Sequence, residues 1–196
     1  DYPEYIMYDN DVMKAKKSKW NEYFGNSNPI AVEIGTGSGN FMYQLAERNP
    51  NKNFIGLELR FKRLVLATQK CQKRNIKNVA FLRKRGEELE DFLAENEISE
   101  MYINFPDPWE GTEKNRIIQE RLFKTLDKIM KKDGMLYFKT DHDVYYNDVL
   151  ELVKTLDNYK VIYHTSDLHN SEKASENIKT EFEQMFLSKH NMKIKY

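Results

Sequence analysis

Hydrophobic and polar positions along the chain follow two different periods. Short runs of aliphatic, β-branched and aromatic residues, such as 30–34 and 101–105, predict buried strands, whereas apolar residues at helical spacing over 118–130 predict an amphipathic helix. Strands are predicted over 30–34, 54–59, 79–82, 101–105, 135–139 and 160–164. Helices are predicted over 11–24, 40–48, 61–74, 87–95, 118–130 and 144–156.

This alternation predicts a doubly wound, Rossmann-like α/β domain whose mostly parallel sheet is covered by helices on both faces. The last strand, 160–164, is expected to run antiparallel near the C-terminus. No linker, repeat or low-complexity segment divides the chain, so residues 1–196 are expected to form one domain, with an N-terminal helix within 1–24 packed on it. Ligands of such sheets bind at the carboxyl ends of the strands, so the residues that follow each strand are the candidates for chemistry.

Composition is typical of a soluble globular domain. The chain has 196 residues, 40% of them hydrophobic, and 31 Lys and Arg residues balance 31 Asp and Glu residues. No apolar run approaches the length of a membrane-spanning helix, which predicts no membrane partner. A single cysteine, Cys71, and histidines without metal-ligand spacing predict neither a disulfide nor a metal site, and they indicate a reducing, cytoplasmic location.

The zero net charge hides a strong segregation of charge along the sequence. Ten basic residues and no acidic one lie between Arg60 and Arg85, whereas seven carboxylates and no basic residue lie between Gly86 and Glu100. Two interpretations stay open: two solvated faces of opposite sign, or a basic face that binds a polyanion while the acidic face points away from it.

Glycines at every second position follow the first predicted strand. Gly35, Gly37 and Gly39 allow a ligand to approach the backbone closely and accept positive φ angles. The turn is not the dinucleotide-binding fingerprint, because that motif needs glycine where this chain has Asn40. Glu58 ends the next strand, where an acidic side chain can bind both hydroxyls of a ribose. The glycine turn and Glu58 together favour a nucleoside cofactor site over a plain strand-to-helix connection.

The most specific signal is the run Asn-Phe-Pro-Asp-Pro-Trp at 104–109. Two prolines fix the backbone on either side of Asp107, so its carboxylate is presented rigidly after a strand. Trp109 beside it can stack on a base or exclude water. A merely structural turn is the alternative interpretation.

This run, placed after the glycine turn, resembles the bacterial tRNA (guanine-N7)-methyltransferase family. Further matches in the same order are Lys-Thr-Asp at 139–141, Asp-Leu-His at 167–169 and Thr-Glu-Phe-Glu at 180–183, and the resemblance runs from Trp20 to the end. It implies a class I methyltransferase fold, S-adenosylmethionine as cofactor, and tRNA as partner of a monomer or homodimer. The implied reaction is methyl transfer to N7 of a guanine, commonly position 46 of the variable loop.

The resemblance also assigns roles to individual residues. Those implied at the cofactor are Glu33, Gly35, Gly37, Gly39, Glu58 and Asp107. Those implied at the guanine are Asp141, Thr180, Glu181, Phe182 and Glu183. Asp107 is the implied catalytic residue, between cofactor and base. The chemistry suits carboxylates, because N7 has an in-plane lone pair and needs no general base, while positive charge develops on the guanine ring.

The chain departs from the family pattern in two places. Where the family has a dense basic stretch after the tryptophan, this chain has 110–117, with Lys114 and Arg116 as the available substitutes for tRNA contact beside Trp109. Arg85 stands at the position of a cofactor-facing Asp or Asn. A guanidinium cannot accept a hydrogen bond from the adenine amino group, so another acceptor is expected there.

Three alternatives stay open at the level of sequence. A methyltransferase of the same fold acting on another RNA or a small molecule is consistent with Glu110 and Gly111 in place of basic residues. A catalytically inactive RNA-binding module is disfavoured by intact Glu33, Glu58 and Asp107, and cofactor binding distinguishes it. A nicotinamide-dependent dehydrogenase is the weakest, because Asn40 breaks its fingerprint.

Overall fold

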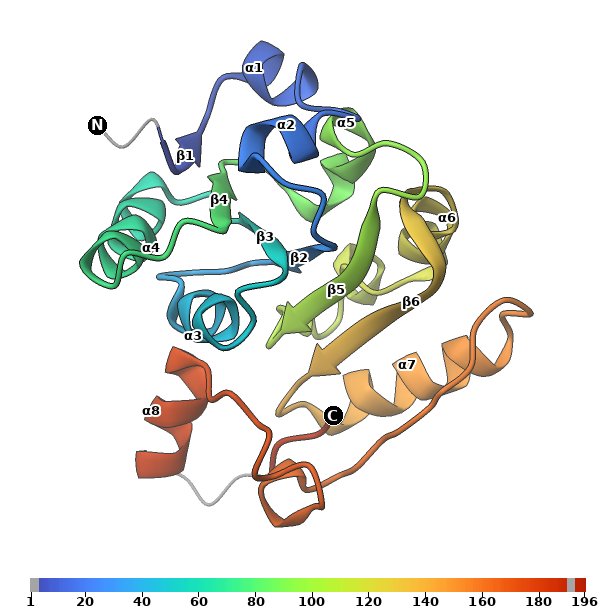
Figure 1. The fold of residues 1–196 in the computed structure, drawn as a ribbon. Coiled ribbons are helices and arrows are strands. Elements are labelled where there is room, and N and C mark those ends of the chain that lie inside the picture. Colours follow the sequence, from blue (N-terminus) through green and yellow to red (C-terminus); the bar gives the residue numbers. More distant parts are fainter. Residues whose placement is uncertain (1–3, 190–192) are drawn as a thin grey trace.

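The computed structural model describes residues 4–189 and 193–196. Six parallel strands form one sheet in the order β1-β4-β3-β2-β5-β6 (Figure 1). Their bounds are β1 Ile6–Met7, β2 Ile30–Ile34, β3 Asn53–Leu57, β4 Val79–Leu82, β5 Ile98–Asn104 and β6 Met130–Lys139. The chain runs outward from β2 through β3 to β4, then returns to β5 on the other side of β2. The direction therefore switches between β2 and β5, which is where sheets of this kind bind ligands.

Helices cover both faces of this sheet. Their bounds are α1 Asn10–Lys14, α2 Trp20–Phe24, α3 Asn40–Arg48, α4 Phe61–Lys73, α5 Leu89–Phe92, α6 Glu120–Ile129, α7 Asp143–Lys154 and α8 Glu181–Lys189. Neighbouring strand residues point to opposite faces, so Ala31 packs with α3 and α4 while Val32 packs in the core that contains Trp20 and Leu126. These two buried clusters confirm the predicted three-layer α/β fold.

The predicted antiparallel strand at 160–164 is wrong. Those residues form no strand, and all pairings of the described sheet are parallel. The antiparallel contact is instead an isolated bridge between Thr140 and Lys195, while Tyr196 exchanges backbone hydrogen bonds with Thr165. The last residues therefore occupy the space beside β6, and Ile162 is left exposed.

The predicted helix over 11–24 is also wrong in its continuity. The segment contains two short helices, α1 and α2, because Ser18 adopts a left-handed φ of 65° between them. Asp9 caps α1 by accepting hydrogen bonds from two backbone amides, and the Trp20 indole donates to the carbonyl oxygen of Phe92 at 2.9 Å. The Trp20 bond ties α2 to α5, and α1 also contacts α5. The helix predicted over 87–95 is likewise shorter, a 3₁₀ turn followed by α5, whereas β1 and α8 were not predicted.

Candidate functional site

The glycine turn after β2 follows the predicted geometry. Gly35, Gly37 and Gly39 have φ angles of 78°, 55° and 74°, all in the left-handed region. The Gly35 amide donates to the carbonyl oxygen of Leu57, which ties the turn to the end of β3. A Cβ atom at Gly39 would lie 2.6 Å from that of Ala67 in α4, so only glycine fits there. The turn thus packs directly on α4, with its backbone at the switch point.

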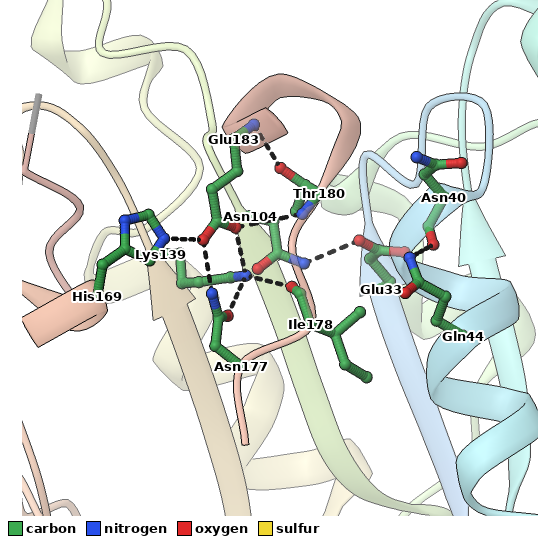
Figure 2. Close-up of polar contacts among 10 residues, drawn as sticks. All are labelled: Glu33, Asn40, Gln44, Asn104, Lys139, His169, Asn177, Ile178, Thr180 and Glu183. Atoms are coloured by element: carbon green, nitrogen blue, oxygen red, sulfur yellow. Dashed lines mark hydrogen bonds and ion pairs between the residues drawn. The ribbon is translucent and has the colours of Figure 1, made fainter. Parts of the chain in front are cut away.

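Glu33 joins the turn to β5 across the switch point. Its Oε2 accepts a hydrogen bond from the Thr36 hydroxyl at 2.7 Å. Its Oε1 accepts one from the Asn104 amide at 2.9 Å (Figure 2). The side chain is only 2% exposed, and this burial raises the pKa of Glu33. In this structure, therefore, Glu33 holds β2, the turn and β5 in register.

The end of β3 supplies a second carboxylate at the same edge. Glu58 directly follows β3, is half-buried, and accepts a hydrogen bond from the Arg60 amide at 2.8 Å. A Cβ atom at Gly35 would meet nothing within 4 Å, so the backbone there is open to a ligand. This open turn and the Glu58 carboxylate fit the close approach and the ribose hydroxyls of S-adenosylmethionine. Arg85 is exposed at the neighbouring strand end and, as expected, offers only donors.

The loop that carries Asp107 is strained on both sides of it. Phe105 and Trp109 have φ angles of 51° and 46°, which cost on the order of 1–3 kcal/mol each in non-glycine residues. The Phe105 amide donates to the carbonyl oxygen of Lys139 at 2.7 Å, and its ring lies 4.7 Å from that of Phe182 in α8. Asp107 is exposed and Trp109 is 45% exposed. Such strain is typical of functional sites, and here it presents an acid and an aromatic ring.

The two basic residues after Trp109 have different surroundings. Lys114 is exposed. The Arg116 side chain is buried, donates to the carbonyl oxygen of Pro108 at 2.6 Å, and forms an ion pair with Asp148 at 2.7 Å. The expectation that Arg116 substitutes for an exposed basic stretch is therefore corrected. Its guanidinium braces the Asp107 loop against α7 instead.

Thr180 and Glu183 begin α8 with a reciprocal capping box. The Glu183 amide donates to Thr180 Oγ1 at 3.0 Å, and the Thr180 amide donates to Glu183 Oε2 at 3.2 Å (Figure 2). Both side chains are buried. The Thr-Glu-Phe-Glu run thus has a local structural role that is visible in its spacing.

Glu183 is also the centre of a buried polar cluster. Its carboxylate accepts from Lys139 Nζ at 3.0 Å and from Asn177 Nδ2 at 2.6 Å, and it faces His169 Nε2 at 2.6 Å (Figure 2). Burial acts to raise its pKa, but Lys139 and these hydrogen bonds outweigh it and hold the pKa of Glu183 below its ordinary value. The side chain is 0% exposed, so the expected direct contact with guanine does not match its surroundings.

A polar relay links the glycine turn to α8. Lys70 Nζ donates to Ser38 Oγ at 3.0 Å and to Asn40 Oδ1 at 3.0 Å, and the Ser38 hydroxyl donates to Glu181 Oε2 at 2.6 Å. A hydroxyl has one proton, so the direction of these hydrogen bonds runs from Lys70 through Ser38 to Glu181. Sequence reasoning missed this role of Ser38 and Lys70, because it depends on partners that are distant in sequence.

Asp141 follows β6 at the same edge as Asp107, because β5 and β6 are paired in parallel up to Asn104 and Lys139. Asp141 is half-buried, and its backbone carbonyl accepts a hydrogen bond from Lys195 at 2.9 Å. The structure therefore brings the glycine turn, Glu58, the Asp107 loop, Asp141 and the start of α8 to one edge of the sheet.

Residues 27–196 match a family model described as "Putative methyltransferase". A tRNA (guanine-N(7)-)-methyltransferase of Lachnoclostridium phytofermentans is 39% identical over 190 residues, which cover 96% of this chain and 87% of that protein. The chain belongs to the tRNA (guanine-N7)-methyltransferase family. Membership assigns it methyl transfer from S-adenosylmethionine, in agreement with the fit of the glycine turn and Glu58.

Two further proteins are similar to this chain. A bifunctional glycosyltransferase/methyltransferase of Fusobacterium nucleatum subsp. nucleatum is 92% identical over all 196 residues, and the chain spans only 31% of that protein's length. A solved structure titled "Structure of an Antibiotic Related Methyltransferase" superposes with a TM-score of 0.64 at 14% identity, covering 91% of this chain and 90% of that one. At such low identity the likeness shows the fold alone.

Searches of the residues that the structure describes give two negative findings. Within 4–189 and 193–196, no helix has the length and apolar character that crossing a membrane requires. Over the same ranges, no three or more His, Cys, Asp and Glu side chains are grouped as metal ligands.

Proposed function

We propose that this chain methylates N7 of a guanine in the variable loop of tRNA, with Asp107 at the reacting base. The observation that carries the proposal is the exposed Asp107, held between two left-handed residues next to the open glycine turn. Relatives that are 35–39% identical over nearly the whole chain are named tRNA (guanine-N(7)-)-methyltransferase. When bound, S-adenosylmethionine supplies the electrophilic methyl group.

The residues at this edge suit the reaction without a general base. The N7 lone pair would form a bond to the methyl group as the methyl–sulfur bond breaks, so the positive charge would pass to the guanine ring and S-adenosylhomocysteine would leave. Carboxylates of Asp107 and Asp141 stabilise that charge and accept hydrogen bonds from the N1 and N2 edge of the base. The exposed Trp109 ring stacks on a base, and Glu58 binds the cofactor ribose. Thr180 and Glu183 act as positioning residues that place Glu181 and Phe182 beside the guanine.

The bifunctional name of the Fusobacterium relative pairs two activities, and we assign the methyl transfer to this chain. The support is that 190 residues of this chain cover 87% of a separate methyltransferase from Lachnoclostridium, whereas the chain spans only 31% of the Fusobacterium relative. We treat residues 1–196 as one methyltransferase domain, and we propose that it acts in the cytoplasm as a monomer or homodimer.

The direct test is transfer of labelled methyl from S-adenosylmethionine to unmodified tRNA transcripts. The labelled position is mapped by cleavage chemistry that is selective for 7-methylguanine. The variant Asp107→Ala is compared with Asp157→Ala, which removes an exposed carboxylate in the loop after α7. The matched pair separates loss of Asp107 from loss of one negative charge.

The expected result is a label on one variable-loop guanine with the wild type and with Asp157→Ala, and a rate at least about 100-fold lower with Asp107→Ala. A label at another tRNA position would overturn the variable-loop assignment alone. Cofactor binding without any methylation of tRNA would overturn the tRNA substrate and favour another RNA or a small molecule.

A further inference from the structure

Exposed aromatic and basic side chains gather at the outer part of the same sheet edge. Tyr8 follows β1, Arg83 follows β4, and Phe61 begins α4. The Tyr8 and Phe61 rings meet edge-to-face with centroids 6.1 Å apart, yet they remain 67% and 45% exposed. Two large rings that pack on each other and still face solvent are unusual for a surface that has no partner.

Arginines surround this aromatic pair. The Arg83 amide donates to the carbonyl oxygen of Met7 at 2.9 Å, and its guanidinium donates to that of Leu59 at 3.0 Å, which places it between β1 and α4. Arg60 precedes Phe61, and the Arg63 guanidinium lies 3.3 Å from where a Cβ atom of Gly37 would stand. The surface therefore reaches from Tyr8 to the glycine turn.

Within 4–189 and 193–196, no Asp or Glu side chain forms an ion pair with Arg60, Arg63 or Arg83. No acidic residue occurs between Arg60 and Arg85. Nearby, Glu58 accepts a hydrogen bond from the Arg60 amide, and Asp9 caps α1. Lys84 does not belong to the surface, because it is buried in ion pairs with Glu88 and Asp91. Only part of the basic run 60–85 is therefore exposed on this surface and available to bind RNA.

We propose that Tyr8, Arg60, Phe61, Arg63 and Arg83 form a basic–aromatic surface that binds a single-stranded part of tRNA. Guanidinium groups neutralise phosphates, and exposed rings supply faces on which unpaired bases stack. This combination favours single-stranded RNA over a protein partner, because the unpaired bases and the phosphates of one strand match the rings and the guanidinium groups together. The inference rests on the proposed function, because it takes the RNA to be the methylated substrate.

The test measures tRNA binding by filter retention at several salt concentrations, without any methyl transfer. Arg63→Glu with Arg83→Glu is compared with Lys131→Glu with Lys132→Glu, two exposed lysines at the amino end of β6. Both double variants change the net charge equally, so only the position of the charge differs. Tyr8→Ser with Phe61→Ser tests stacking with the charges left in place.

We expect the arginine variant to bind at least about tenfold more weakly and its salt dependence to fall by about 2 in slope, one for each lost phosphate contact. The aromatic variant is expected to lose about tenfold with an unchanged slope, and the lysine variant to bind like the wild type. The proposed surface would be overturned by equal effects of the two charge reversals or by no effect of either. It would also be overturned if the wild-type chain did not bind tRNA. Tight binding at this surface without methylation would count against the proposed reaction only.

Discussion

The glycine turn at 35–39 and the C-terminal segment at 177–183 both carry family motifs, but they are built in different ways. The turn is defined by its own backbone, since each of its three glycines has a left-handed φ and Gly39 has no room for a side chain. The C-terminal segment depends on distant partners, because Glu183 is held by Lys139, 44 residues away in sequence. The motif in the first region corresponds to a backbone geometry, whereas the motif in the second region includes a buried ion pair that anchors the start of α8.

The anchor gives the largest expected effect. Lys139→Met leaves the buried Glu183 carboxylate without its counter-charge, so we expect unfolding free energy to fall by about 3–5 kcal/mol in urea denaturation. Lys154→Met removes an exposed pair with Glu151 and is expected to cost less than about 0.5 kcal/mol. Similar losses for the two variants would show that the buried pair anchors nothing.

The turn gives the next effect. Gly39→Ala introduces left-handed strain of about 1–3 kcal/mol and a clash with Ala67, so we expect both lower stability and loss of S-adenosylhomocysteine binding. Gly25→Ala is the matched control, because Gly25 has a φ of 68° but nothing within 4 Å of an added Cβ atom. Binding that survives in Gly39→Ala would contradict the close packing of the turn on α4.

The hydrogen-bond relay between the glycine turn and α8 is expected to contribute less free energy than either feature above. Ser38→Ala and Glu181→Ala each remove the hydrogen bond from Ser38 to Glu181, and we expect a coupling energy of about 1 kcal/mol in a double-mutant cycle on tRNA binding. The cycle is measured with and without S-adenosylhomocysteine. Additive effects under both conditions would show that the turn and α8 act independently.

The pH dependence gives the smallest effect near neutrality. The folded pKa of Glu183 lies below its unfolded value, so its stabilisation is complete well above the ordinary glutamate pKa, about 4.3, and is lost as pH falls through the folded pKa. We expect Glu183→Gln to lower stability and to remove the acid-sensitive part, so the stability difference between the two chains varies by less than about 0.5 kcal/mol above pH 5 and shrinks as the pH falls further. Both chains carry His169→Gln, so that the neighbouring imidazole does not titrate. Identical pH profiles would contradict the lowered pKa.

The sequence predicted those features that depend on local pattern. The strands at 30–34 and 79–82 have the predicted bounds, because short buried β-prone runs leave few alternatives. The glycine turn was also predicted, because glycine readily adopts the positive φ angles that the turn has. The strand predicted at 160–164 was wrong, although its apolar residues suit a strand. The last residues of the chain pair instead with Thr140, directly after β6.

The sequence could not predict long-range pairing in the site. Arg116 looks like an exposed basic residue until Asp148 and the carbonyl of Pro108 are seen to bury it. Glu183 looks like a ligand-binding acid until its four donors are known. The capping box has a sequence signature, threonine and glutamate three residues apart, but helix α8 was not predicted from it.

The most direct test compares Glu183→Gln with Asp107→Asn in one methyl-transfer assay on tRNA. We expect Asp107→Asn to lower kcat by about 100-fold with stability unchanged, because Asp107 is exposed and the proposed function places it at the reacting base. Glu183→Gln is expected to lower stability while kcat stays within about threefold of the wild type. A kcat for Glu183→Gln as low as that of Asp107→Asn, at unchanged stability, would contradict the division between reacting edge and buried anchor.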